Sequence, residues 1–368
     1  MKSMRTPAQA VIIATLALTA AFSAHAQQTE AETGFGIQGT LSGLAAAGTE
    51  FGEAPRSGSL VDGGFRLMLY PTWKISEHWS VAGACQTISR PYYHDDFSTQ
   101  GHGVRASIVQ AYLSYSQVGK KASLVVRIGE LSSAFGSFSL HYDDRDNPMV
   151  DLPMQYGYYG AAATLSALAG VQVDATWHKW DARGQFVNSS PANPRSVLDS
   201  EQYGSWAGGA GYTIRQGLRV GASGYRGPYL DRHYPFYFPG EALPRSLPAS
   251  GVGVEGQWGH GHWNVRGEMQ RFVMQYKLIP DFHQRIGYTE VQRSLGPRWY
   301  VAARYGYLNA DYVGTVHSIE TVAGFRPGPG QIIKLSYETR HSTGVTAPDR
   351  TLVVQFVTAI HPLSFVRH

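Results

Sequence analysis

The sequence predicts a transmembrane antiparallel β-barrel of about 16 strands. Three observations support this fold class. Apolar and polar residues alternate in many short segments, tight turns alternate with long connections along the chain, and the composition is rich in glycine and tyrosine (42 Gly, 22 Tyr) but low in charge (16%). Barrels of this class combine apolar outer faces with a polar interior, which gives this kind of composition.

The first 26 residues predict a secretory signal peptide. Lys2 and Arg5 precede an apolar run, and the small-residue site Ala24-His25-Ala26 stands just before Gln27. The run of about fifteen apolar residues is short for a membrane-spanning helix, and no later stretch reaches the ~18 that such a helix needs. We therefore expect residues 27–368 to form a single exported barrel domain.

Charge and cysteine content argue against a nucleic-acid-binding protein and against a disulfide-rich protein. Without Lys2 and Arg5, the 31 basic residues fall to 29, against 27 acidic ones. This near balance gives no electrostatic case for binding nucleic acid. Cys85 is the single cysteine of the chain, which excludes an internal disulfide framework.

Strand-like segments have one apolar face and one polar face. In residues 263–273 the two faces are Trp263, Val265, Met269 and Val273 against Asn264, Arg266, Glu268 and Gln270. Residues 65–74 and 332–340 follow the same rule. A soluble β-sandwich also alternates in this way, so the connections between strands have to distinguish the two folds.

The connections favour the barrel. Tight links near 76–77, 119–120, 215–216, 259–261, 296–297 and 327–330 alternate with long links at 48–60, 90–103, 131–169, 190–202, 226–250 and 342–350. Outer-membrane barrels have short turns on one rim and long loops on the other. Five tryptophans lie close to the tight links, as an aromatic girdle requires: Trp73, Trp79, Trp258, Trp263 and Trp299. In a soluble domain the same residues would be core residues.

We expect strands to begin near residues 34, 62, 79, 104, 121, 171, 182, 203, 217, 251, 262, 281, 297, 316, 330 and 351. A further candidate strand, Gly160–Leu168, would put the long 190–202 loop on the short-turn rim. We therefore assign it to the preceding loop. The resulting even count keeps both ends of the chain on the same side of the membrane.

The longest connection contains a recognisable sequence motif. The run RIGELSSAFGSFSL, which starts at Arg127, is followed by an acidic segment, by Asp151-Leu152-Pro153 and by Tyr158-Tyr159-Gly160. It resembles the third-loop region of Gram-negative porins, especially the phosphate-selective and DcaP-like group. The matching residues are Gly129, Ala134 (proline in most of these porins), Phe135, Gly136, Pro148 and Pro153. The resemblance implies a bacterial outer-membrane channel, a third loop that folds back into the lumen, and a homotrimer.

An inward third loop has a physical purpose in a barrel of this size. About sixteen strands enclose a water-filled channel, so selectivity requires something that narrows it. A connection this long in a compact protein is usually functional or disordered. We assign to the constriction loop the charged residues Asp143, Asp144, Arg145, Asp146 and Asp151. The alternative is a solvated extracellular loop.

Strand parity predicts which charged residues face the lumen. If apolar faces look outward, the pore-lining residues are Arg66, Arg127, Arg219, Arg266, Arg285, Arg304, Arg326, Lys334 and Arg340. Fewer acidic residues share this parity: Asp174, Glu255, Glu268, Glu320 and Glu338. A basic wall that faces an acidic loop would favour anions and orient dipolar solutes. For any single arginine the alternative is a structural ion pair, such as Arg266 with Glu268 or Arg340 with Glu338.

The sequence offers little catalytic or metal-binding chemistry. His260 and His262 are two residues apart but lack the further ligands of a zinc site. Residues 143–147 lack the glycine and terminal glutamate of a calcium loop. There is no GxSxG, HExxH or phosphate-binding loop. His94-Asp95-Asp96 could belong to an outward-facing enzyme site, although such loop residues are usually solvated. We expect no enzyme activity, no cofactor and no metal.

These observations predict a porin, a passive diffusion channel for small hydrophilic solutes that are anionic or dipolar. Its partners would be membrane lipid, lipopolysaccharide and the solutes, with no nucleic acid. The alternative is a non-conducting outer-membrane barrel whose extracellular loops serve adhesion or surface binding. The aromatic and proline-rich residues 226–250 are the main candidates for that second role.

Overall fold

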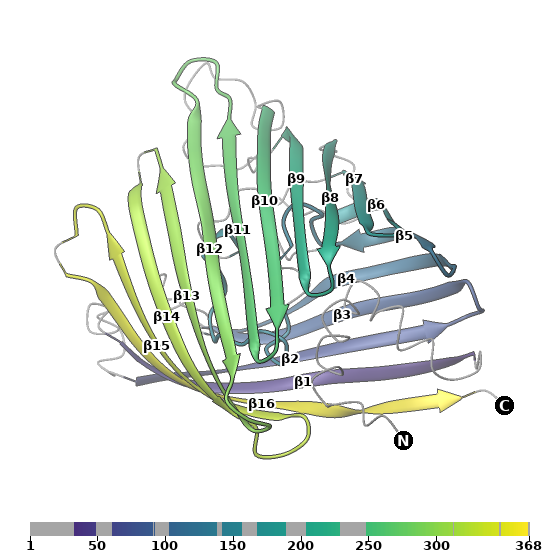
Figure 1. The fold of residues 1–368 in the computed structure, drawn as a ribbon, viewed down its shortest axis with the longest axis horizontal. Coiled ribbons are helices and arrows are strands. Elements are labelled where there is room, and N and C mark those ends of the chain that lie inside the picture. Colours follow the sequence, from purple (N-terminus) through teal and green to yellow (C-terminus); the bar gives the residue numbers. More distant parts are fainter. Residues whose placement is uncertain are drawn as a thin grey trace.

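The computed structural model describes residues 33–48, 61–90, 92, 103–137, 142–156, 168–188, 204–228, 248–311, 313–345 and 347–366. Within them, 16 antiparallel strands form one closed barrel, in which each strand pairs with its neighbours in the chain and the first strand pairs with the last (Figure 1). The described residues contain no helix that is long and apolar enough to cross a membrane.

The strands are β1 (Gly34–Gly48), β2 (Val61–Lys74), β3 (Trp79–Arg90), β4 (Gly103–Val118), β5 (Ala122–Leu131), β6 (Leu168–Trp177), β7 (Trp180–Val187), β8 (Ser205–Arg215), β9 (Leu218–Pro228), β10 (Pro248–His260), β11 (Trp263–Met274), β12 (Phe282–Ser294), β13 (Trp299–Ala310), β14 (Gly314–Phe325), β15 (Gln331–Ser342) and β16 (Asp349–Val366). A short 3-10 helix, η3 (Met154–Tyr156), lies in the connection between β5 and β6. The expected strand number and the order of short and long connections are confirmed.

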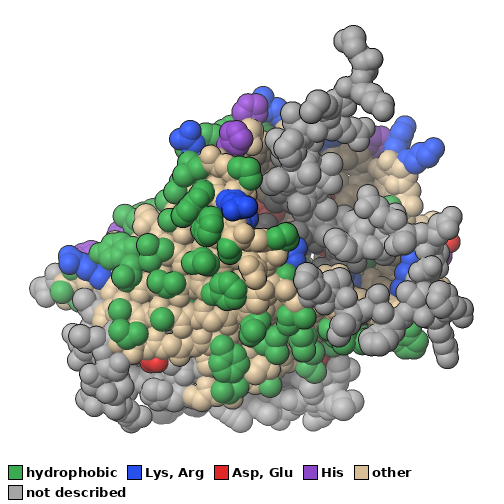
Figure 2. Space-filling view, turned by 90° about the horizontal axis from the view of Figure 1, so that it is seen from below, with side chains coloured by type: hydrophobic (Ala, Val, Ile, Leu, Met, Phe, Trp, Pro, Cys, Tyr) green, Lys and Arg blue, Asp and Glu red, His purple; other side chains and the backbone are tan. Residues whose placement is uncertain are grey.

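The outer and inner faces of the barrel differ as the alternation predicts. On β15, Leu335 and Tyr337 are exposed outward, whereas Lys334 and Arg340 are buried inside. Figure 2 shows hydrophobic side chains spread over the outside of the strands. A closed barrel has no open sheet edge, so its backbone groups are satisfied inside a bilayer. The apolar exterior is therefore a lipid-facing surface.

An aromatic girdle surrounds the short-turn rim. Trp73, Trp79, Trp263 and Trp299 are each between 43% and 53% exposed. Two further tryptophans, Trp177 and Trp180, flank the turn between β6 and β7 and are 62% and 53% exposed. The girdle is wider than the sequence predicts, because the β6–β7 turn is too tight to stand out in the sequence.

Several expectations fall on residues that the structure does not describe. These are the signal peptide at residues 1–26, the segment 160–167 that we assigned to a loop, the group His94-Asp95-Asp96, and most of the 226–250 loop. They remain predictions.

Candidate solute pathway and its constriction loop

The chain leaves the barrel wall at the end of β5. Gly129 has a φ of 141°, and a Cβ at this position would collide with the backbone of Ala111 and Tyr112 on β4. Glycine therefore lets the two strands approach closely just before the chain turns into the lumen. Leu131 ends the strand with a buried side chain.

Residues 132–137 cross the inner face of the next strands. The Gln185 amide donates to the Ser132 carbonyl at 2.8 Å, and its oxygen accepts from the Ala134 N–H at 3.0 Å. The Phe135 ring is buried in an apolar cluster on β9, β10 and β11, made by Tyr225, Ala249 and Phe272. The first part of the loop is thus fixed inside the barrel.

Glu268 of β11 binds the loop at two places. Its carboxylate accepts hydrogen bonds from the N–H and the hydroxyl of Ser137, each at 3.2 Å, and from the hydroxyl of Tyr156 at 2.9 Å. Ser137 lies near the beginning of the loop and Tyr156 nineteen residues later in the chain. One buried carboxylate therefore ties two distant parts of the loop to the same point on the wall.

The acidic part of the loop contacts β2. Asp144 forms an ion pair with Arg66 at 2.9 Å, with side-chain exposures of 3% and 0%, and accepts a hydrogen bond from the Tyr92 hydroxyl at 2.7 Å. The Tyr70 hydroxyl donates to Asp143. A buried ion pair of this kind is costly to break, because one charge would stay buried without its partner.

Tyr142 reaches both sides of the lumen. The Arg66 guanidinium lies 4.0 Å from the centre of its ring, and its hydroxyl donates to Gln86 of β3 at 2.6 Å. The same tyrosine packs against the cluster of Tyr156 and Tyr288 on the loop and β12. The loop thus bridges the lumen from β2 and β3 to β12.

Lys334 of β15 is a further point at which the barrel wall holds the loop. Its side chain is fully buried, and its ammonium donates to the carbonyls of Asp144, Asn147 and Met149 at 2.6, 2.8 and 3.0 Å. An ammonium has three N–H donors, so these carbonyls satisfy all of them. Lys334 therefore determines the path of residues 144–149.

Arg304 of β13 holds the following segment. It donates to the Asp151 carbonyl at 2.8 Å, while Glu320 of β14 accepts from the N–H groups of Val150 and Asp151 at 2.9 and 3.2 Å. The Asp151 carboxylate lies 3.6 Å from Arg340. Residues 142–151 therefore lie against the wall by way of both charges and backbone groups. The inward fold of the third loop is confirmed.

The arginines beneath the loop also pair along the wall. Arg340 is 3.1 Å from Glu338, which is the structural pair that the sequence offered as an alternative. Arg266 pairs instead with Glu290 of β12 at 2.7 Å, because the two residues are direct partners in the register of β11 and β12, while Glu268 binds the loop. We call this inner surface the covered sector (Arg66, Arg266, Arg304, Lys334 and Arg340).

The inner face of β5–β9 is less enclosed, and we call it the open sector (Arg127, Asp174, Asp181, Arg183 and Arg219). Arg127 pairs with Asp174 at 2.7 Å, and their side chains are 16% and 26% exposed. Arg219 pairs with Asp181, and these side chains are 24% and 37% exposed. Neither Asp181 nor Arg183 was singled out in the sequence, although both follow the period-two pattern of β7.

Two other predicted pore-lining residues lie elsewhere. Arg326 follows β14 at the short-turn rim, with its guanidinium 4.8 Å from the ring centre of Tyr300. Arg285 is exposed on the outside of β12, whereas Gln284 and Ile286 face inward, so its predicted orientation is wrong. Inward Ile286 packs against the loop residue Met154. The loop makes this part of the inner face apolar, which misleads a rule that puts apolar residues outside.

Arg145 and Asp146 are the exposed charges of the described loop. Asp146 keeps contact with solvent, but the surrounding protein removes part of its hydration. This desolvation, together with the nearby Asp143 carboxylate, raises the pKa of Asp146 to about 6. The side chain therefore changes charge near neutral pH.

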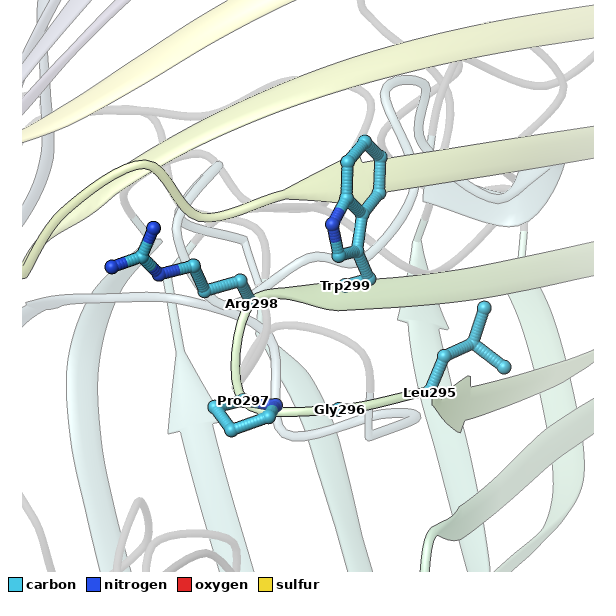
Figure 3. A pocket seen from close by; sticks show the side chains of 5 residues that line it. All are labelled: Leu295, Gly296, Pro297, Arg298 and Trp299. Atoms are coloured by element: carbon cyan, nitrogen blue, oxygen red, sulfur yellow. The ribbon is translucent and has the colours of Figure 1, made fainter.

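A recess at the β12–β13 turn is lined by the five consecutive residues Leu295–Trp299 (Figure 3). Its one charged side chain, Arg298, projects away from Trp299 in this view. Among the described residues, no three His, Cys, Asp or Glu side chains are grouped as a metal site would require.

Comparison with known proteins supports the fold. OmpF of Salmonella typhi, in a complex with daunomycin, aligns with a TM-score of 0.62 at 9% identity over 89% of this chain and 98% of OmpF. The outer-membrane channel DcaP of Acinetobacter baumannii aligns with a TM-score of 0.60 at 10% identity over 89% of this chain and 97% of DcaP.

OmpT of Vibrio cholerae, an outer membrane protein in its trimer form, gives a TM-score of 0.57 at 9% identity over 89% of this chain and all of OmpT. No family model and no curated protein sequence matches the chain. The chain therefore has the barrel fold of these Gram-negative outer-membrane proteins, as its third-loop sequence predicted.

Proposed function

We propose that the protein is a porin of the bacterial outer membrane, a passive channel for small hydrophilic solutes that are anionic or dipolar. One observation carries the proposal: the third loop is bound across one side of the lumen, while charged side chains of the open sector stay accessible. A rigid loop would set the size limit. The charges of the opposite wall would then act on the solutes that pass.

The selection would be electrostatic. The open sector offers Arg127 and Arg219 together with Arg183, which also donates to the loop carbonyl of Gly136, and the loop offers Asp146 on its exposed surface. Arginine binds carboxylates and phosphates through a planar fork that stays charged at all relevant pH values. Each of these arginines already has a carboxylate partner in the wall, so the sector would suit dipolar solutes as well as anions.

Single-channel recording from the refolded protein in a planar bilayer tests the proposal, with the reversal potential measured across a KCl gradient. Stable conductance steps with chloride preference are the expected result. Steps with cation preference would keep the channel but assign control to the loop carboxylates. The absence of steps from a folded, heat-modifiable barrel would contradict the channel and favour adhesion through the long loops, or an enzyme.

We further propose a homotrimer in a membrane that contains lipopolysaccharide. The resemblance of the third loop and the trimer form of OmpT support this assembly. Chemical cross-linking in mild detergent should give a threefold species. Cross-linking that yields only monomer would count against the trimer without affecting the proposed channel.

A further inference from the structure

Two arginines lie opposite each other on the outside of the barrel. Arg271 of β11 and Arg285 of β12 are partners in the strand register, and both are exposed. Within the described part of the chain, neither side chain forms a hydrogen bond or an ion pair. Like charges that are directly opposite on neighbouring strands destabilise a sheet. An anion that binds both guanidinium groups would relieve this repulsion.

The depth of the pair in the bilayer indicates where that anion lies. Arg271 stands three residues before the end of β11 at Met274, and Arg285 three residues after the start of β12 at Phe282. With a rise of about 3.3 Å per residue, both lie roughly 10 Å from the long-loop end of their strands. Their long side chains can reach the headgroup layer from this position.

The surface on the β10 side of the pair is apolar. Val252 of β10 is the register partner of Arg271 and is 63% exposed, Val254 is 61% exposed, and Met269 is 39% exposed. Two carboxylates at this end of the strands already have partners: Asp311 is bound to His283 at 3.1 Å, and Asp281 accepts a hydrogen bond from the Tyr276 N–H at 3.3 Å. The site thus combines two guanidinium groups with an apolar strip that can pack against acyl chains.

We propose that Arg271 and Arg285 bind the phosphate of a glycolipid in the outer leaflet, with the acyl chains of this lipid on Val252, Val254 and Met269. Two guanidinium forks offer several N–H donors to one phosphate. The apolar strip explains why a lipid fits better than a soluble anion. The inference rests on the proposed outer-membrane location but not on channel activity.

Binding of bisphosphorylated lipid A to the purified, folded protein in detergent tests this site. The variant R271Q/R285Q should bind at least about tenfold more weakly, because two bidentate contacts are lost. The matched control is R293Q. Arg293 is an exposed arginine of the same strand that lies over Trp263 at 4.9 Å on the short-turn rim, so this variant should bind like the unmodified protein.

Further measurements define the chemistry. Lipid A without its phosphates should bind the unmodified protein as weakly as the bisphosphorylated form binds the double variant, and inorganic phosphate at equal concentration should not compete. R271K/R285K should bind with intermediate strength, because it keeps the charge without the fork. Heat-modifiable mobility identifies folded protein, and R285Q alone replaces the double variant if that variant does not fold.

Three results would overturn the lipid site. They are equal binding of both lipid A forms, unchanged binding by the folded double variant, and a change in cross-linked oligomers that assigns this surface to a second copy of the chain. Single-channel conductance of R271Q/R285Q should equal that of the unmodified protein. Loss of lipid binding with normal conductance, or the reverse, therefore separates this site from the proposed channel.

Discussion

The covered and open sectors use the same kinds of residue for different purposes. Arg66 and Arg304 in the covered sector are 0% and 3% exposed at the side chain, whereas Arg219 in the open sector is 24% exposed. All three face the lumen and all three pair with carboxylates. The difference is the loop, whose residues 142–151 lie over Arg66 and Arg304 and leave Arg219 accessible. Orientation toward the lumen alone does not make a residue pore-lining.

Deletion of residues 143–151 should have the largest effect, because it removes the segment that distinguishes the covered sector from the open sector. This segment carries the contacts to Arg66, Lys334 and Arg304, so its loss would expose the covered sector to the lumen. We expect single-channel conductance to rise severalfold, because the narrowing element is removed. Unchanged conductance in a folded, heat-modifiable barrel would show that this loop does not form the constriction.

Replacement of Lys334 by Met should release the loop without removing it. Three loop carbonyls would lose their buried donor, at a cost on the order of 3 kcal/mol in the free energy of unfolding. Denaturant unfolding should show this loss, and recordings should show larger fluctuations of the open-channel current. Lys120→Met at an exposed turn is the control, and equal stability of the two variants would contradict the role of Lys334.

Replacement of Arg219 by Gln tests whether the open sector contributes more to ion selectivity than the covered sector does. The variant removes an accessible positive charge, so the reversal potential should move toward cation preference. The matched variant Arg340→Gln removes a buried charge of the covered sector and should lower stability with little change in selectivity. Equal shifts of the reversal potential for both variants would contradict different roles of the two sectors in ion selectivity.

The smallest expected effect is a pH dependence of ion selectivity. The pKa of Asp146 is raised from 3.8 to about 6, so its charge is lost as the pH falls through 6. Anion preference should therefore increase between pH 7 and pH 5, and Asp146→Asn should show the low-pH selectivity throughout. The folded state binds this proton more tightly than the unfolded chain does. The neutral carboxyl thus contributes stability that is complete below pH 3.8 and is lost as the pH rises through about 6.

The fold was predictable because it depends on a repeated local pattern. Each strand of this barrel has one face toward lipid and one toward the lumen, so period-two alternation recurs along the chain. The inward fold of the third loop was predictable from its length and from its residues Ala134-Phe135-Gly136. These features do not depend on where one side chain meets another.

The roles of single charges were not predictable, because they depend on the path of the loop. Lys334 and Arg304 have the parity of pore-lining residues, yet they bind loop carbonyls. Arg285 was assigned to the wrong face because Ile286 packs beneath the loop. Asp181 has the inward parity of β7 but was not singled out in the sequence, and its side chain is 37% exposed in the structure.

The closure of the barrel has a consequence for the order of assembly. Gly34 of β1 pairs with Val366 of β16, so the final seam joins the first and the last strand of the barrel and cannot form until β16 has been synthesised. Contacts this distant in sequence make folding slow. The last strand also contributes to the inner surface that holds the third loop. Gln355 donates to Tyr92, which in turn binds Asp144 of the loop, and Val357 packs on Met149. A chain that lacks β16 would therefore lose both the closed barrel wall and part of the inner surface on which the third loop packs.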